Sequence, residues 1–133
     1  MKKIFIVTLI LLLSCNKDDD SNNTNPLIGN WKETEVRQRY NETDEWGQWF
    51  NRYLDTRINF IDNTFLLSTF NGQETLLRYE YLPQENLIKT YEADTQEFIT
   101  QNKLFIINEN EIVTEFYALN YFTQVKYNRI ASP

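Results

Sequence analysis

The residues best suited to bind a ligand are aromatic and lie close together in the chain. Trp46, Trp49, Phe50 and Tyr53 follow one another at positions i, i+3, i+4 and i+7, and Leu54 stands at i+8. This spacing is typical of one face of a helix. Rings on one face can stack on an apolar molecule or on a sugar ring. The four aromatic residues are therefore the candidate ligand contacts.

The same segment allows other interpretations. Instead of a helix over 44–54, residues 50–61 can form one long strand that leaves Trp46 in a loop. The rings can also form a hydrophobic plug that fills one end of the fold and contacts no ligand. Each alternative places large side chains between the first two strands of the domain.

Catalytic chemistry has little support in the composition. The chain has no histidine and its only cysteine is Cys15, so the domain lacks the usual general base, the commonest metal ligand and a thiol nucleophile. With 19 acidic residues, a close pair of carboxylates is expected by chance. Residues 18–20 and 62–63 offer oxygen ligands, but without the spacing of a calcium loop. We expect no enzyme, no catalytic residue, no metal site and no cofactor.

Cys15 ends a segment typical of an exported lipoprotein. Two lysines precede residues 4–13, which are apolar except for one threonine and are too few to span a bilayer, which takes about 20 residues. The motif Leu12-Leu13-Ser14-Cys15 resembles the lipobox of bacterial lipoproteins. The resemblance implies that residues 1–14 are a cleaved signal peptide and that acyl chains on Cys15 anchor the protein in a membrane. The alternative is an ordinary secretory signal with a chance cysteine.

Residues 16–25 contain no apolar side chain, so that 15–25 are expected to be the lipidated cysteine and a flexible tether. Ten residues span at most about 35 Å. The run Lys17-Asp18-Asp19-Asp20 resembles the export signal of Bacteroidota lipoproteins, which implies a place on the outer face of the outer membrane. An ordinary acidic spacer, with the protein facing the periplasm, is the alternative.

The charge of the exported part excludes some partners. Without its two signal lysines the chain keeps 11 basic residues against 19 acidic ones, a net charge of −8. Such a charge disfavours nucleic acid and anionic lipid surfaces. Because no cysteine remains for an intramolecular disulfide, residues 26–133 must form a single domain held by its core.

Short β-rich runs separated by turn residues fill the domain and predict eight strands. The predicted strands are 31–40, 56–61, 64–70, 74–82, 87–92, 97–107, 112–119 and 121–130. Asn71-Gly72 is the strongest turn signal, because a type I′ hairpin needs positive φ at both central residues. Short turns force consecutive strands to pair antiparallel, and eight such strands are expected to close into an up-and-down β-barrel.

Alternation of apolar and polar residues gives each later strand one buried face, but the first strand does not follow this pattern. Glu33 and Arg37 fall on one side of it, and Lys32 and Gln38 on the other. Either this strand bends away from the core after Trp31, or the barrel interior is partly polar there.

Gly29-Asn30-Trp31 at the start of the first strand resembles the Gly-x-Trp motif of lipocalin-like domains, as found in small lipoproteins of Bacteroidota. The segment 58–65 and the last strand, which ends at Ile130, fit the same family. In lipocalins an arginine of the last strand packs over the tryptophan of this motif, and Arg129 is the matching position. The resemblance implies that Gly29, Trp31 and Arg129 close the bottom of a lipocalin-like barrel.

Two functions follow from these features. In the first, the barrel holds a small apolar or partly apolar ligand beneath Trp46 and Trp49. In the second, the interior is filled by its own side chains and the outer surface binds a protein or a glycan. A barrel of eight strands is compatible with both, so the volume of its interior decides between them.

Overall fold

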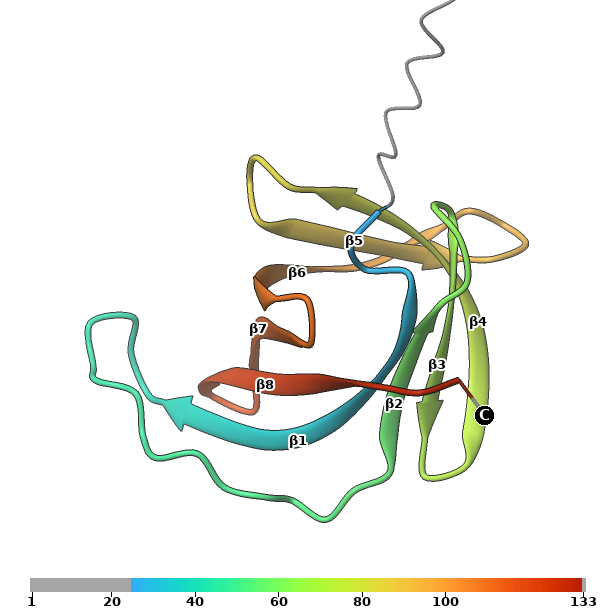
Figure 1. The fold of residues 1–133 in the computed structure, drawn as a ribbon. Coiled ribbons are helices and arrows are strands. Elements are labelled where there is room, and N and C mark those ends of the chain that lie inside the picture. The colour runs from blue at the N-terminus through green and yellow to red at the C-terminus, as the bar shows by residue number, and fades with distance from the viewer. Residues whose placement is uncertain (1–24, 133) are drawn as a thin grey trace, which may run out of the picture.

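The structure, a computed structural model, describes residues 25–132. These residues form eight strands that close into one antiparallel barrel in chain order, with β8 paired to β1 (Figure 1). The strands are β1 (Gly29–Arg39), β2 (Thr56–Phe60), β3 (Phe65–Phe70), β4 (Gln73–Leu82), β5 (Leu87–Glu92), β6 (Phe98–Asn108), β7 (Glu111–Ala118) and β8 (Tyr121–Ile130). The predicted fold, an all-β up-and-down barrel of eight antiparallel strands, is confirmed. The predicted signal peptide and Cys15 lie outside the described residues.

Tight turns join most of the strands and explain why neighbours in the chain are neighbours in the barrel. Asn71 and Gly72 both have positive φ, at 48° and 81°, as the predicted hairpin turn between β3 and β4 requires. Leu119 and Asn120 adopt the same conformation between β7 and β8, at 52° and 67°. The part of the chain that the structure describes contains no helix, and therefore none that could span a membrane.

One end of the barrel is filled by its own side chains. The largest side chains with less than 2% exposure lie there or beside it: Trp31, Phe60, Leu27, Leu104, Ile112, Val36 and Val125. A water-sized space next to any of them would appear as exposed surface, so this end is closely packed. In this packed region the rings of Tyr79 and Phe60 contact each other edge to face, with their centres 5.0 Å apart.

Toward the other end many inward-facing positions are polar, although Phe116, which pairs with Thr123, also faces inward. These positions, assigned from the strand pairing and from alternation, carry Gln38, Ser68, Thr75, Thr90, Thr100, Asn102 and Thr123. Thr75 and Thr100 are exposed, and Gln38 donates to the Thr123 hydroxyl at 3.3 Å. The interior is therefore mostly apolar at one end, whereas polar side chains occupy many of the inward-facing positions at the other.

A β-bulge explains the unusual pattern of β1. Glu33 pairs with Tyr127 and Glu35 with Lys126, so Thr34 is an extra residue without a partner. The bulge reverses the alternation, with the result that Trp31 and Glu33 face inward before it and Val36 after it. The suggested departure of β1 from the core is wrong, because Val36 has no exposed surface. The alternative, a partly polar interior, agrees with the buried side chain of Glu33.

The connector between β1 and β2, residues 40–55, contains no regular element. Both predictions for it, a helix over 44–54 and a strand over 50–61, are wrong as stated, since the strand begins only at Thr56. The connector folds back along β1, outside the ring of strands (Figure 1). Phe50 and Val36 exchange two backbone hydrogen bonds of 2.8 Å, and the Gly47 amide donates to the Gln38 carbonyl at 3.0 Å. The connector thus covers the part of β1 that β2 is too short to pair.

Candidate binding site on the outer face of the barrel

Gly29, Trp31 and Arg129 meet at the packed end of the barrel, where the chain enters it. The Arg129 guanidinium lies over the Trp31 ring, 4.2 Å from its centre. Arg129 also donates to the carbonyl oxygens of Glu109, Ile28 and Pro26 at 2.6–2.7 Å. The Trp31 indole N–H donates to the carbonyl of the fully buried Leu27 at 2.7 Å. We call this end of the barrel the floor.

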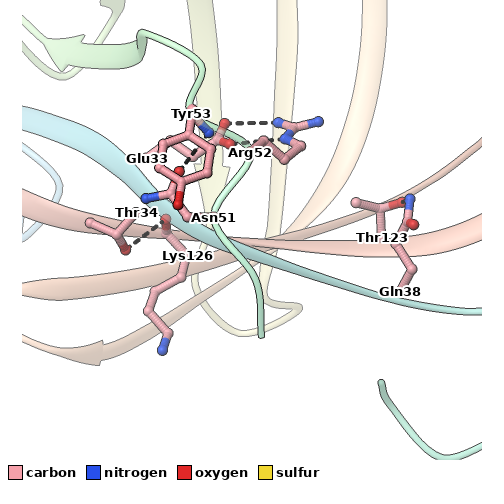
Figure 2. Close-up of polar contacts among 8 residues, drawn as sticks. All are labelled: Glu33, Thr34, Gln38, Asn51, Arg52, Tyr53, Thr123 and Lys126. Atoms are coloured by element: carbon pink, nitrogen blue, oxygen red, sulfur yellow. Dashed lines mark hydrogen bonds and ion pairs between the residues drawn. The ribbon is translucent and has the colours of Figure 1, made fainter. Parts of the chain in front are cut away.

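An ion pair joins the connector to the barrel interior. Arg52 donates from Nε and Nη2 to the two carboxylate oxygens of Glu33 at 2.9 and 2.8 Å, and Figure 2 shows the two groups facing each other. The Glu33 side chain is only 3% exposed, whereas that of Arg52 is 33% exposed. This hydrogen bond is the main cause of the raised pKa of Arg52. The pair fixes the connector to β1 just before the bulge.

The two tryptophans of the connector lie over the outer face of the barrel. There, cationic and aromatic side chains alternate in the order Lys126, Trp49, Arg37, Trp46, Arg39 and Phe122. Each cationic centre lies 4.3–5.5 Å from the centre of the next ring, which is within range for cation–π attraction. We call this row the cation–aromatic ladder. It rests on outward-facing residues of β1 and β8.

The structure does not bring the four predicted ligand contacts together. Trp46 and Trp49 are half-buried in the ladder, Phe50 faces Val36 and is 46% exposed, and Tyr53 is 91% exposed. Tyr53 also has a φ of 56°, which no right-handed helix allows. The helical spacing of these residues is therefore coincidental, and neither tryptophan covers the barrel interior.

A polar network beneath the ladder joins four strands, and sequence reasoning missed it. Arg37 donates from Nε to Oε1 of Gln124 at 2.8 Å, and Nε2 of Gln124 donates to Oε2 of Glu115 at 2.7 Å. Lys103 contacts the other oxygen of Glu115 at 3.2 Å. These residues come from β1, β8, β7 and β6. The outward parity of Gln124, Glu115 and Lys103 was visible in the sequence. That of Arg37 depends on the bulge at Thr34, and the closeness of the four residues depends on the register of three strand pairs.

A groove of about 340 Å³ lies beside Trp49 on the same outer face. Its lining residues are Arg37, Trp49, Phe105, Ile107, Glu111, Val113, Gln124 and Lys126. A second pocket, of about 450 Å³, lies at the floor and is lined by Asn25, Pro26, Asn63, Tyr79, Tyr81, Pro83 and Ile106. Both volumes fall near the lower end of the range for ligand sites, about 300–1,000 Å³.

The carboxylates show no arrangement for metal binding. Among residues 25–132, no group of three or more possible ligands gathers around a common point. Asp62 uses its Oδ1 to accept the backbone N–H groups of Thr64 and Phe65, at 2.7 and 2.8 Å. Its role is to hold the turn between β2 and β3.

Comparison with known proteins adds nothing to this geometry, because no protein family, no curated protein and no solved structure matches the chain.

Proposed function

We propose that the protein is a non-catalytic interaction module, anchored by acyl chains on Cys15 and displayed on the outer face of the outer membrane. The observation that supports this function is the division of the barrel interior. Apart from the pocket beside Tyr79 and Tyr81, the floor end leaves no water-sized space around Trp31 or Leu104. Toward the other end, hydroxyl and amide groups share the interior with Phe116. Outside the floor pocket, an apolar ligand would have to displace packed side chains or leave those polar groups without partners.

The outer face is better equipped for recognition. It combines Trp46 and Trp49 with three cationic side chains, and tryptophan and arginine are the residue types that most often dominate binding surfaces. The residues beneath them are held by hydrogen bonds, so binding would not have to order them.

The proposed anchor is compatible with this use of the outer face. The described chain starts at Asn25, at the floor, where its side-chain amide donates to the Tyr79 hydroxyl at 2.8 Å. A tether of ten residues would keep the floor within about 35 Å of the membrane. The other end of the barrel would then point away from the membrane. The outer wall would stand at the side, so both would stay accessible.

A second candidate function is the binding of a small, partly apolar molecule, and the pocket at the floor favours it. Tyr81 and Ile106 contribute apolar surface there, and burial raises the pKa of the Tyr81 hydroxyl. The same family resemblance, to lipocalin-like lipoproteins, supports either function.

Native mass spectrometry distinguishes the two functions. The chain from residue 16 onward is expressed in a standard bacterial host and purified without detergent. We expect its measured mass to equal that of the polypeptide without a ligand. An adduct that survives purification and is lost in Tyr81→Trp, which fills the floor pocket, would overturn the interaction module in favour of a ligand carrier.

The anchor has its own test. Radiolabelled palmitate should enter the full-length protein and not Cys15→Ser, and protease added to intact cells should remove the wild-type domain. Labelling of Cys15→Ser would contradict acylation at this residue, and a domain cleaved only after lysis would place it in the periplasm.

A further inference from the structure

The groove beside Trp49 combines one aromatic wall with several polar side chains. Trp49 comes from the connector, whereas Phe105 and Val113 supply apolar surface from β6 and β7. Arg37, Gln124, Lys126 and Glu111 surround them. A groove of about 340 Å³ is small, and suits a single ring or a short piece of a longer chain.

The Trp49 indole is held in place by charges. Arg37 and Lys126 each lie 4.4 Å from its ring centre, and the Phe50–Val36 hydrogen bonds fix the backbone next to it. The side chain remains half-buried, so part of it is exposed toward the groove. The part of the indole that lines the groove offers an apolar surface that costs little conformational entropy on binding.

The polar groups around this apolar surface are fixed as well. Gln124 is held at both ends of its amide, by Arg37 at 2.8 Å and by Glu115 at 2.7 Å. Within residues 25–132 the Arg37 guanidinium makes hydrogen bonds only through Nε, which leaves its terminal N–H groups for a ligand. The pKa of Arg37 is lowered, mainly by burial and also by the charge of Arg39, and Glu115 offsets this only in part. Further acceptors would therefore stabilise the cation.

Charges of both signs line the groove, which disfavours an ionic ligand. Lys126 is already paired with Glu35 at 2.6 Å, and Arg37 lines the same groove as the carboxylate of Glu111. An anion would meet Glu111, and a cation would meet Arg37. A neutral molecule with many hydroxyl groups can satisfy both, because each hydroxyl donates and accepts.

A peptide strand is also disfavoured. The groove lies over β6, β7 and β8, each of which pairs with a neighbour on both sides. No free strand edge is available there for an added strand.

We propose that this groove binds a neutral sugar ring of a glycan, with the ring stacked on Trp49 and its hydroxyl groups bonded to Arg37, Gln124 and Glu111. The C–H groups on one face of a pyranose ring match the indole, and its rim of hydroxyls matches the mixed polar groups. The proposal rests on the interaction module proposed above and names its ligand class.

Affinity electrophoresis of the chain from residue 16 onward tests the proposal. The gels contain a neutral polysaccharide (mannan, xylan or laminarin) or the acidic polygalacturonate. At least one neutral polysaccharide should slow the wild-type protein, and Trp49→Ala should weaken this affinity by about tenfold or more. Phe98→Ala is the matched control, because it removes another exposed aromatic ring, which does not line the groove, and should retain the wild-type affinity within about twofold.

A second variant separates binding from folding. Glu111→Gln keeps the size of a rim side chain and should lower the affinity several-fold with an unchanged melting temperature, since Glu111 makes no hydrogen bond through its side chain in the described part of the chain. Equal losses in Phe98→Ala and Trp49→Ala would overturn the assignment to this groove. Retardation by polygalacturonate alone would overturn the neutral ligand.

The two proposals fail separately. If no neutral polysaccharide slows the wild-type protein, the sugar site is wrong, while an interaction module with a protein partner remains. If native mass spectrometry finds an adduct that Tyr81→Trp abolishes, the module itself is wrong, whatever the groove variants do.

Discussion

The guanidinium of Arg129, the penultimate residue of β8, lies 4.2 Å from the ring centre of Trp31, the third residue of β1. The two residues are paired in register across the seam that closes the barrel. Arg129 also binds three carbonyl oxygens, two of them from the segment that leads into β1. One side chain therefore joins the last strand, the first strand and the entering chain.

Replacing Arg129 by alanine should destabilise the domain by about 2–3 kcal/mol, because it removes the stacking and the charged hydrogen bonds together. Arg129→Lys should recover only a small part, since an ammonium group cannot reach three carbonyls in a planar arrangement. Urea unfolding measures both values. A loss below about 0.5 kcal/mol for the alanine variant would show that the floor does not depend on this residue.

Gly29→Ala should be more damaging than Gly72→Ala. A Cβ at Gly29, where φ is 128°, would lie 2.5 Å from Nη1 of Arg129, whereas at Gly72, with φ 81°, it would meet no atom within 4 Å. We expect a loss of about 1–2 kcal/mol at Gly72 from backbone strain alone, and a clearly larger one at Gly29. In an Arg129→Ala background the excess at Gly29 should decrease to the part that comes from backbone strain at a φ of 128°. Urea unfolding of the double mutant checks this, and an unchanged excess would exclude the steric cause.

Arg52→Ala should cost about 1–3 kcal/mol. It leaves the buried Glu33 carboxylate without its partner, and the exposure of a third of the Arg52 side chain reduces the effect through solvent screening. Arg57→Ala is the matched control, since its ion pair with Asp55 is exposed at both ends and should contribute less than about 0.5 kcal/mol. Calorimetry compares the two. Equal losses would mean that burial of Glu33 adds nothing.

Stability should fall in alkaline solution. Burial raises the pKa of Tyr127 far above its usual value of 10.0, so the folded chain keeps a proton that the unfolded chain releases. Stability contributed by this group is complete below pH 10 and decreases above it by about 1.4 kcal/mol per pH unit. Tyr127→Phe should flatten this decrease in urea unfolding between about pH 8 and pH 11. Part of the decrease should remain in the Tyr127→Phe variant, because burial also raises the pKa values of Tyr79 and Tyr81.

Leu119→Asn should stabilise the domain by about 0.5–1 kcal/mol. Leu119 has a φ of 52° in the turn between β7 and β8 and is 90% exposed, so leucine suffers the strain without gaining burial. Asparagine tolerates this conformation. A lower melting temperature for the variant would show that the leucine side chain makes a contact that stabilises the fold.

Local pattern was sufficient to determine the eight strands, their order and the closed barrel. Every predicted strand end lies within two residues of the observed one, because hydrophobic alternation and turn residues such as Asn71-Gly72 act over short distances. Antiparallel pairing follows directly from the short turns between the strands.

Tertiary structure alone decided where the binding residues lie. The bulge at Thr34 adds one residue to β1, and only pairing with β8 shows it, yet it turns Arg37 outward and Val36 inward. The helical spacing in the connector did not predict its conformation, because Trp46 and Trp49 take the positions that their contacts with Arg37, Arg39 and Lys126 allow. The contact between Arg37 and Gln124, which are 87 positions apart, depends on strand register and barrel closure. No local sequence pattern contains this information.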